Sequence, residues 1–261
     1  MAATTIEWTH RCLADGTSVP GYTFNVVWGC AKVSEGCRDC YALTFARRLG
    51  LDLWGLDGPR RTFGLSYWQQ PLRWNKQAQR SGHRRNVFCS SMADVFEAHP
   101  TVEQERTKLW PLMERTPWLN WLLLTKRPEH IMAMVPWGKH FPDNVWMGTS
   151  VENQRRADER VPLLLEVPAV VRFLSCEPLL EGLDLTSYLA RLSWVIVGGE
   201  SGARARPMEQ QWVRALRSQA QAHGTCFFFK QWGGRTHTAG GRLLDGRTWD
   251  EMPPECPGEV I

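Results

Sequence analysis

Seven short apolar runs, most of them followed by polar residues, restrict the folds that this 261-residue chain can adopt. The runs lie at 24–27, 86–89, 121–124, 144–147, 170–174, 194–197 and 226–229. Most are continuous rather than alternating, which is typical of a strand that is buried on both faces. We therefore predict seven strands within a sheet.

Polar stretches with helical spacing separate these runs. The spacing is clearest over 209–222, where Trp212, Val213, Leu216 and Ala220 form one apolar stripe. Further helices are expected over 41–49, 101–115, 127–135 and 153–165, with Pro111 and Pro162 interrupting two of them.

The alternation of strand and helix predicts an α/β fold in which helices cover a parallel sheet. Seven strands favour a partial or complete parallel (β/α) barrel of the TIM-like type over two separate domains. We expect one domain over 1–261. Residues 50–85 are too long for a bare loop and are expected to form an insertion or flap. Residues 234–261 are rich in turn-forming residues and are expected to form an irregular tail.

Three cysteines in one loop, Cys30, Cys37 and Cys40, closely follow the first apolar run. Three thiolates in one loop can hold three irons of a 4Fe-4S cluster and leave the fourth iron open to a substrate or cofactor. A purely structural metal site normally needs a fourth protein ligand. The loop therefore predicts an iron–sulfur site.

A structural zinc site is the first alternative, since His10 or Cys12 could supply a fourth donor if the segment around Pro20 and Gly21 loops back. Disulfides are less favoured, because the chain shows no signal peptide and no apolar run of the about 18 residues that span a membrane. We expect a cytoplasmic, reducing environment and no membrane partner.

Polar residues follow nearly every predicted strand. Beyond the cysteine loop, these clusters are Ser90-Ser91 with Asp94, Thr125-Lys126-Arg127, Thr149-Ser150 with Glu152, Ser175 with Glu177, Gly198 to Gly202 with Glu200, and Lys230-Gln231. One serine after a strand is commonly a helix cap, so the whole set carries the argument. Because ligand sites gather at the carboxyl ends of parallel strands, the set predicts a charged binding cavity.

Two other functions remain open at this point. The net charge of +4 permits a nucleic-acid partner without requiring one. The basic stretch from Arg73 to Arg85 and the 14 tryptophans suit a zinc-stabilised nucleic-acid-binding protein in which bases stack on aromatic rings. The strand-end carboxylates suit a barrel hydrolase that keeps a metal cluster for structure alone.

The cysteine loop resembles that of the radical S-adenosylmethionine superfamily. Further blocks look like the phage gp thirty-seven / gp sixty-eight family, namely Ile6 to Thr9, Cys89 to Asp94, Leu124 to Pro128, Gly148 to Glu152, Phe173 to Pro178, Val197 to Ser201 and Phe228 to Gly233. These blocks occur in the same order in both. The resemblance implies a barrel enzyme whose cofactors are a 4Fe-4S cluster and S-adenosyl-L-methionine.

The resemblance also implies roles for individual residues. Cys30, Cys37 and Cys40 would ligate three irons, while S-adenosylmethionine chelates the fourth. Lys126 or Arg127 would neutralise the carboxylate of the bound methionine moiety. The implied partners are an electron donor and an unidentified substrate, which could be a nucleotide, a nucleic acid or a small metabolite.

Other strand-end residues would complete the site. Glu152, Glu177, Ser90 and Ser91 would accept hydrogen bonds from the ammonium and ribose hydroxyls of the cofactor. Glu200 and Lys230, on the far strands, would face the substrate as catalytic residues.

The chain departs from the commonest superfamily pattern in two places. Six residues separate the first two cysteines where three are usual, and Asp39 precedes Cys40 where an aromatic residue is usual, so Tyr41 is expected to take over the adenine contact. Ser90-Ser91 stands where a glycine-glycine-glutamate sequence usually follows the second strand.

Overall fold

The computed structural model describes residues 3–13 and 16–254. Its centre is a seven-stranded sheet in which each strand pairs with the next in parallel. The strands are β3 (Tyr22–Thr23), β4 (Arg85–Cys89), β5 (Leu119–Thr125), β6 (Val145–Ser150), β7 (Arg172–Cys176), β8 (Trp194–Gly198) and β9 (Cys226–Gln231). A short antiparallel pair, β1 (Arg11–Cys12) and β2 (Ser18–Val19), precedes this sheet.

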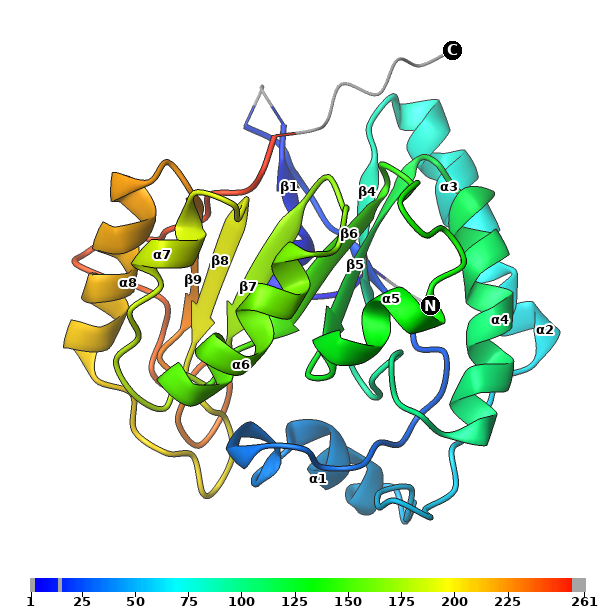
Figure 1. Cartoon of the computed structure of the whole chain (residues 1–261), viewed down its shortest axis with the longest axis horizontal. Helices are drawn as coiled ribbons and strands as arrows, with labels where there is room; N and C mark the ends of the chain where they lie inside the picture. The colour runs from blue at the N-terminus through cyan, green and yellow to red at the C-terminus, as the bar shows by residue number, and fades with distance from the viewer. Residues whose placement is uncertain (1–2, 14–15, 255–261) are drawn as a thin grey trace.

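Helices connect the strands and cover the convex face of the sheet (Figure 1). They are α1 (Tyr41–Arg48), α2 (Leu65–Trp68), α3 (Gln70–Ser81), α4 (Pro100–Glu114), α5 (Ile131–Met134), α6 (Gln154–Leu165), α7 (Thr186–Leu189) and α8 (Gln210–Ala222), with 3-10 helices η1 (Glu7–Thr9), η2 (Glu35–Cys37) and η3 (Pro128–His130). The predicted α/β fold with a parallel sheet is confirmed.

The sheet is curved into a partial barrel, and Trp8 of η1 fills its concave face. The Trp8 ring lies 4.6 Å from Phe88 of β4 and 6.2 Å from Trp194 of β8. Neighbouring strands lie about 4.8 Å apart. In a flat sheet β4 and β8 would be separated by four such spacings, and a single indole could not contact both strands. Only a strongly curved sheet brings both strands to one side chain.

Large side chains fill the concave face so tightly that one position there must be glycine. A Cβ on Gly148 of β6 would lie 2.4 Å from the ring of Phe173 on β7. The ring therefore occupies the space beside the glycine, and the two residues are complementary in size.

The first predicted strand is displaced. The sequence pattern predicts a strand over 24–27, but the structure has β3 at Tyr22–Thr23 and after it a buried segment without regular secondary structure. After Phe24 the backbone hydrogen bonds to side chains instead of to a neighbouring strand. Val26 N–H, for example, donates to Ser90 Oγ at 3.5 Å. Burial alone does not distinguish this segment from a strand.

The other six predicted strands overlap β4 to β9, and the expected helices are confirmed within a few residues. Pro111 and Pro162 do not interrupt α4 and α6 as expected. Both prolines are exposed, so water satisfies the carbonyl groups that lose an N–H partner.

Residues 50–85 divide into two parts. Loops with the short helix α2 make up the first part, and α3 packs against β4 and β5 as the crossover between β3 and β4. Residues 234–254 form no named helix or strand, although Leu244 and Trp249 are buried. No helix among the described residues is long and apolar enough to cross a membrane.

Candidate functional site

The three cysteines lie at the carboxyl ends of the strands. Cys30 follows the buried segment after β3, Cys37 ends η2, and Cys40 precedes the first residue of α1. All three are free, partly buried thiols. The arrowheads of β7 and β8 point toward α1, which lies across this end of the sheet (Figure 1). Ligands bind at this end in parallel α/β folds.

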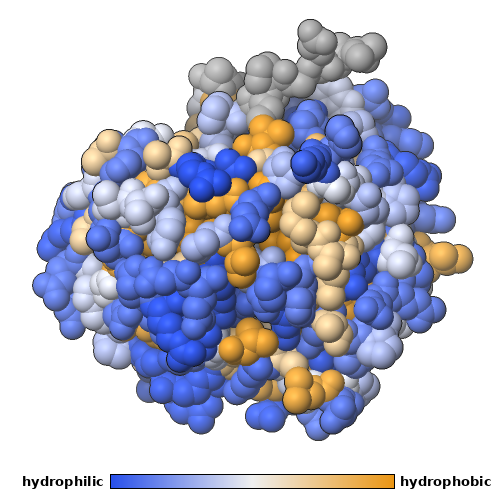
Figure 2. Space-filling model, in the orientation of Figure 1, coloured by the Kyte–Doolittle hydropathy of each residue, from blue (hydrophilic) through white to orange (hydrophobic). Residues whose placement is uncertain are grey.

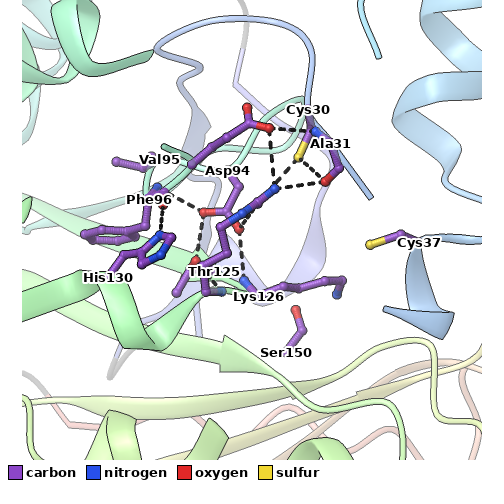
Figure 3. A network of polar contacts seen from close by, with 12 residues as sticks. Cys30, Ala31, Cys37, Asp94, Val95, Phe96, Thr125, Lys126, His130 and Ser150 are labelled. Carbon is purple, nitrogen blue, oxygen red and sulfur yellow. Dashed lines mark hydrogen bonds and ion pairs between the residues drawn. The ribbon is translucent and has the colours of Figure 1, made fainter. Parts of the chain in front are cut away.

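A buried arginine, Arg127, joins Cys30 to Asp94, two residues that lie close together in Figure 3. Its Nη1 donates to Asp94 Oδ2 at 3.0 Å and contacts Cys30 Sγ at 3.8 Å, and its Nη2 donates to the Ala31 carbonyl oxygen at 2.9 Å. Asp94 also accepts a hydrogen bond of 2.7 Å from the Thr125 hydroxyl. Arg127 therefore fixes the backbone beside Cys30.

Glu97 holds the same part of the loop from the other side. Its Oε1 accepts a hydrogen bond of 2.7 Å from Ala31 N–H, and both of its oxygens accept from Arg60 at 2.9 Å. Arg60 also donates to the Leu53 carbonyl oxygen at 3.1 Å. Since all of these groups are buried, the first cysteine lies in a rigid, fully paired network.

This environment disfavours the thiolate of Cys30. Burial and the negative charge of Asp94 raise the pKa of Cys30 to about 12, although Arg127 acts in the opposite direction. Metal binding at this thiol therefore has to displace a proton.

Glu152 fastens the middle of the cysteine loop. The fully buried carboxylate accepts a hydrogen bond of 2.6 Å from the Ser34 hydroxyl and one of 2.8 Å from Arg160, and Lys126 Nζ lies 3.3 Å away. A Cβ on Gly36 would lie 2.4 Å from this carboxylate. The glycine thus allows the loop to approach the end of β6.

A second set of contacts holds the cysteine loop from the end of β8. Arg206 Nε and backbone N–H donate to Glu200 Oε2 at 2.8 and 3.0 Å, and Arg206 Nη1 donates to the Glu35 carbonyl oxygen at 3.1 Å. Arg156 pairs with the Glu35 carboxylate at 3.1 Å. Glu200, expected to face the substrate, therefore holds an arginine that anchors the loop near Cys37.

A further ion pair joins the ends of β7 and β9. Lys230 Nζ donates to Glu177 Oε2 at 2.7 Å, and the Ser175 hydroxyl donates to Glu177 Oε1 at 3.2 Å. Both side chains of the ion pair stay partly exposed. A Cβ on Gly198 would lie 3.0 Å from Glu177. The structure thus brings together two of the predicted site residues, Glu177 and Lys230, and leaves a proton donor and acceptor side by side.

Ser90, Ser91 and Tyr41 meet at the end of β4. The Tyr41 hydroxyl donates to the Ser91 carbonyl oxygen at 2.6 Å, while most of the side chain stays exposed. Asn25 Nδ2 donates to Ser91 Oγ at 3.2 Å. The two serine hydroxyls therefore hold the segment that leads into the cysteine loop.

Three free, partly buried thiols in one loop form a donor set of the kind that a 4Fe-4S cluster uses. Within the described ranges, no group of three His, Cys, Asp or Glu residues could hold one metal ion. A 4Fe-4S cluster places each thiolate on a different iron, so its ligands stand farther apart than those of one ion.

The proposed fourth zinc ligands lie at the opposite end of the sheet. His10 follows η1, and a Cβ on Gly21 would contact both Thr9 and Asn86, the second residue of β4. Cys12 lies in β1, which pairs with β2. The expectation that His10 or Cys12 completes a zinc site with the cysteine loop is therefore wrong, because the chain does not fold back that far.

Sequence reasoning missed several residues that shape the site. They are Asn25, Ser34, Arg60, Glu97, Arg160 and Arg206. Arg60 and Glu97 stand 37 positions apart, so no local spacing indicates their contact. Glu97 does lie in the segment that follows the second predicted strand, which is the one sequence signal that could have added it.

Several solved structures of spore photoproduct lyase are similar to this chain. A variant with bound AdoMet and dinucleoside spore photoproduct is 11% identical with a TM-score of 0.45, and the match covers 82% of this chain and 64% of that one. A complex with dinucleoside spore photoproduct is 12% identical with a TM-score of 0.41, covering 75% and 59%. This chain therefore spans less than two thirds of the length of these structures.

The curated proteins offer no match to this sequence. A protein-family model matches residues 3–253, and its description is a protein of unknown function, DUF5131. The resemblance to the phage gp thirty-seven / gp sixty-eight family stays a prediction from the sequence blocks. Because the match spans nearly the whole chain, this protein belongs to the DUF5131 family.

Proposed function

We propose that this protein is an iron–sulfur enzyme of the radical S-adenosylmethionine type. One observation carries the proposal: three free thiols lie in a single loop that buried ion pairs hold over the open end of a partial parallel barrel. Asp94 and Glu97 after β4, Arg127 after β5, Glu152 after β6 and Glu200 after β8 support this loop.

Cys30, Cys37 and Cys40 would hold three irons of a 4Fe-4S cluster, and S-adenosyl-L-methionine would bind beside them at the strand ends. When bound and reduced, the cluster supplies the electron that cleaves a carbon–sulfur bond of S-adenosylmethionine. An electron donor is therefore a required partner.

We assign the methionine carboxylate to Lys126 in preference to Arg127. The Arg127 guanidinium already donates to Asp94, Glu97 and Ala31. Among the described residues, Lys126 forms an ion pair with one carboxylate, that of Glu152, and its side chain is 20% exposed. A partly exposed ammonium beside the loop is free to bind a second anion.

We assign proton handling at the substrate to Glu177 and Lys230. Their Oε2 and Nζ atoms lie 2.7 Å apart, so a proton can pass between them with little movement. Tyr41 stands nearby with its ring exposed, in a place to stack against an adenine base. Glu200 has the different task of holding Arg206 against the cysteine loop.

The experiment that tests the cluster is anaerobic reconstitution with iron and sulfide. We expect about four irons per chain and an absorbance shoulder of an iron–sulfur chromophore in the native protein, and loss of both in Cys30→Ala, Cys37→Ala and Cys40→Ala. Cys12→Ala is the matched control, because Cys12 is exposed at the other end of the sheet. Stoichiometric zinc without iron in the native protein would contradict the proposal.

The residue assignments have a separate test. Lys126→Ala should retain iron but bind S-adenosylmethionine more weakly or fail to cleave it, whereas Glu177→Ala, at a residue assigned to the substrate, should retain both iron and S-adenosylmethionine binding. Full S-adenosylmethionine binding and cleavage in Lys126→Ala, or loss of S-adenosylmethionine binding in Glu177→Ala, would contradict the assignments while leaving the cluster proposal intact.

A further inference from the structure

We propose that the surface around α1 binds single-stranded nucleic acid and presents one of its bases to the strand-end site. This inference rests on the proposed function and names the class of its substrate. The surface, termed the α1 surface below, consists of Trp28, Tyr41, Phe45, Arg47, Arg48, Arg61 and Phe63.

Its first part is a stripe on α1 that begins at the site. Tyr41, Phe45 and Arg48 are four and three residues apart, so they share one face of the helix. Phe45 is 45% exposed, which is unusual for a phenylalanine beside a polar site. Since the Tyr41 hydroxyl contacts the end of β4, the stripe leads from the strand-end site toward the outside.

A connected group of rings borders this stripe. The Trp28 ring lies 6.0 Å from Phe45 and 6.1 Å from Phe63. The Arg61 guanidinium lies over the Trp28 ring at 5.0 Å and over the Phe63 ring at 5.9 Å. Aromatic rings and guanidinium planes of this kind stack on unpaired bases with little regard to sequence.

The charges on the α1 surface complement a phosphate backbone. Arg47, Arg48 and Arg61 are exposed, and no carboxylate within the described part of the chain forms an ion pair with them. The loop that follows α1 exposes two carboxylates, Asp52 and Asp57, and neither forms an ion pair with these arginines. Figure 2 shows apolar side chains among strongly hydrophilic ones along the lower edge, where α1 lies. Unpaired arginines beside exposed rings match the alternating phosphates and bases of a single strand.

The basic stretch from Arg73 to Arg85 lacks this combination. Arg84 pairs with Asp143 at 3.0 Å, and Arg85 donates to the Pro20 carbonyl oxygen at 2.9 Å. Its exposed arginines, Arg73 and Arg80, flank a tryptophan that is buried. The α1 surface is therefore the better site for bases that need a ring to stack on.

The test is fluorescence anisotropy with labelled oligothymidylate and oligouridylate of about 20 nucleotides, titrated with reconstituted protein at about 50 mM salt. We expect the double variant Arg47→Glu/Arg48→Glu and the single variant Phe45→Ala each to weaken binding about tenfold or more on at least one strand type. The matched control is Arg73→Glu/Arg80→Glu, which also reverses two exposed arginines and should bind like the native protein.

Two results would overturn the inference: native protein that binds neither strand, or Arg73→Glu/Arg80→Glu that loses as much affinity as Arg47→Glu/Arg48→Glu. Iron content measured on the same samples separates this inference from the proposed function. Binding that depends on the α1 surface in a protein unable to hold iron supports the surface and contradicts the cluster. A full iron content with no dependence on the α1 surface contradicts the surface alone.

Discussion

Arg127 shows how a residue that sequence reasoning assigns to a ligand can instead position a loop. It pairs with Asp94 and Glu97, and its side chain is 8% exposed. Arg127→Met would leave both carboxylates buried without their shared partner. We expect a loss of about 3–5 kcal/mol in the free energy of unfolding, measured by urea denaturation.

The control for Arg127 is an arginine with an exposed ion pair. Arg155 pairs with Glu159 at 2.8 Å on the surface of α6, with its side chain 70% exposed. Arg155→Met should cost less than about 1 kcal/mol. Similar losses in the two variants would show that the Arg127 network contributes no more than a surface pair.

Glu152 gives the protein an acid-sensitive contact. Burial alone would raise the pKa of Glu152, but the charges of Lys126 and Arg160 and the hydrogen bond from Ser34 outweigh it and hold the pKa below the ordinary value. A lowered folded-state pKa adds stability above the ordinary glutamate pKa, and this stability is lost as the pH falls through the lowered value.

The free energy of unfolding of Glu152→Gln should therefore differ from that of the native protein most at neutral pH and least in acid. The measurement is the free energy of unfolding of both proteins from neutral pH downward. Glu166→Gln, at an exposed glutamate directly after α6, serves as the control, and its free energy of unfolding should change with pH as that of the native protein does. A difference in the free energy of unfolding between the native protein and Glu152→Gln that stays constant with pH would contradict this account.

At the level of elements, the loop after β8 and the cysteine loop are expected to move together. Glu200 binds Arg206, and Arg206 binds the Glu35 carbonyl oxygen. Glu200→Gln weakens the first contact, so hydrogen exchange should rise over residues 203–206 and 35–37. Glu209→Gln, in the same connection but exposed, should leave exchange unchanged. Unchanged exchange in Glu200→Gln would return Glu200 to the substrate-facing role that the sequence predicted.

The N-terminal segment closes the amino end of the barrel through one residue. Trp8 is 2% exposed and contacts Phe88, Phe173 and Trp194. Trp8→Ala should lower the free energy of unfolding by about 3–5 kcal/mol, and Trp8→Phe by clearly less because a ring remains. Equal stability of Trp8→Ala and the native protein in urea denaturation would show that the stability of the concave core does not depend on Trp8.

For the whole molecule, the sequence predicted the class of fold because continuous apolar runs report burial on both faces of a strand. Six of the seven runs became strands, and residues 24–27 did not because Ser90 replaces a strand partner there. The curvature of the sheet could not be predicted from local sequence patterns. It is evident only from the contacts of one indole, that of Trp8, with two strands that are far apart in the sequence.

The site was predictable to a similar extent. Polar residues after strands meet at one end, as parallel topology requires, and this placed Glu152 and Lys126 together. Whether a given charge faces a ligand or a neighbouring loop depends on contacts such as that of Arg206 with Glu35, which no spacing in the sequence records.

The measurement that tests the central claim most directly is the formation of 5′-deoxyadenosine from S-adenosylmethionine by reconstituted protein reduced with dithionite. The account predicts product from the native protein and from Cys12→Ala, and none from Cys37→Ala. Product from Cys37→Ala at the native rate, or iron-loaded native protein that forms none, would contradict it.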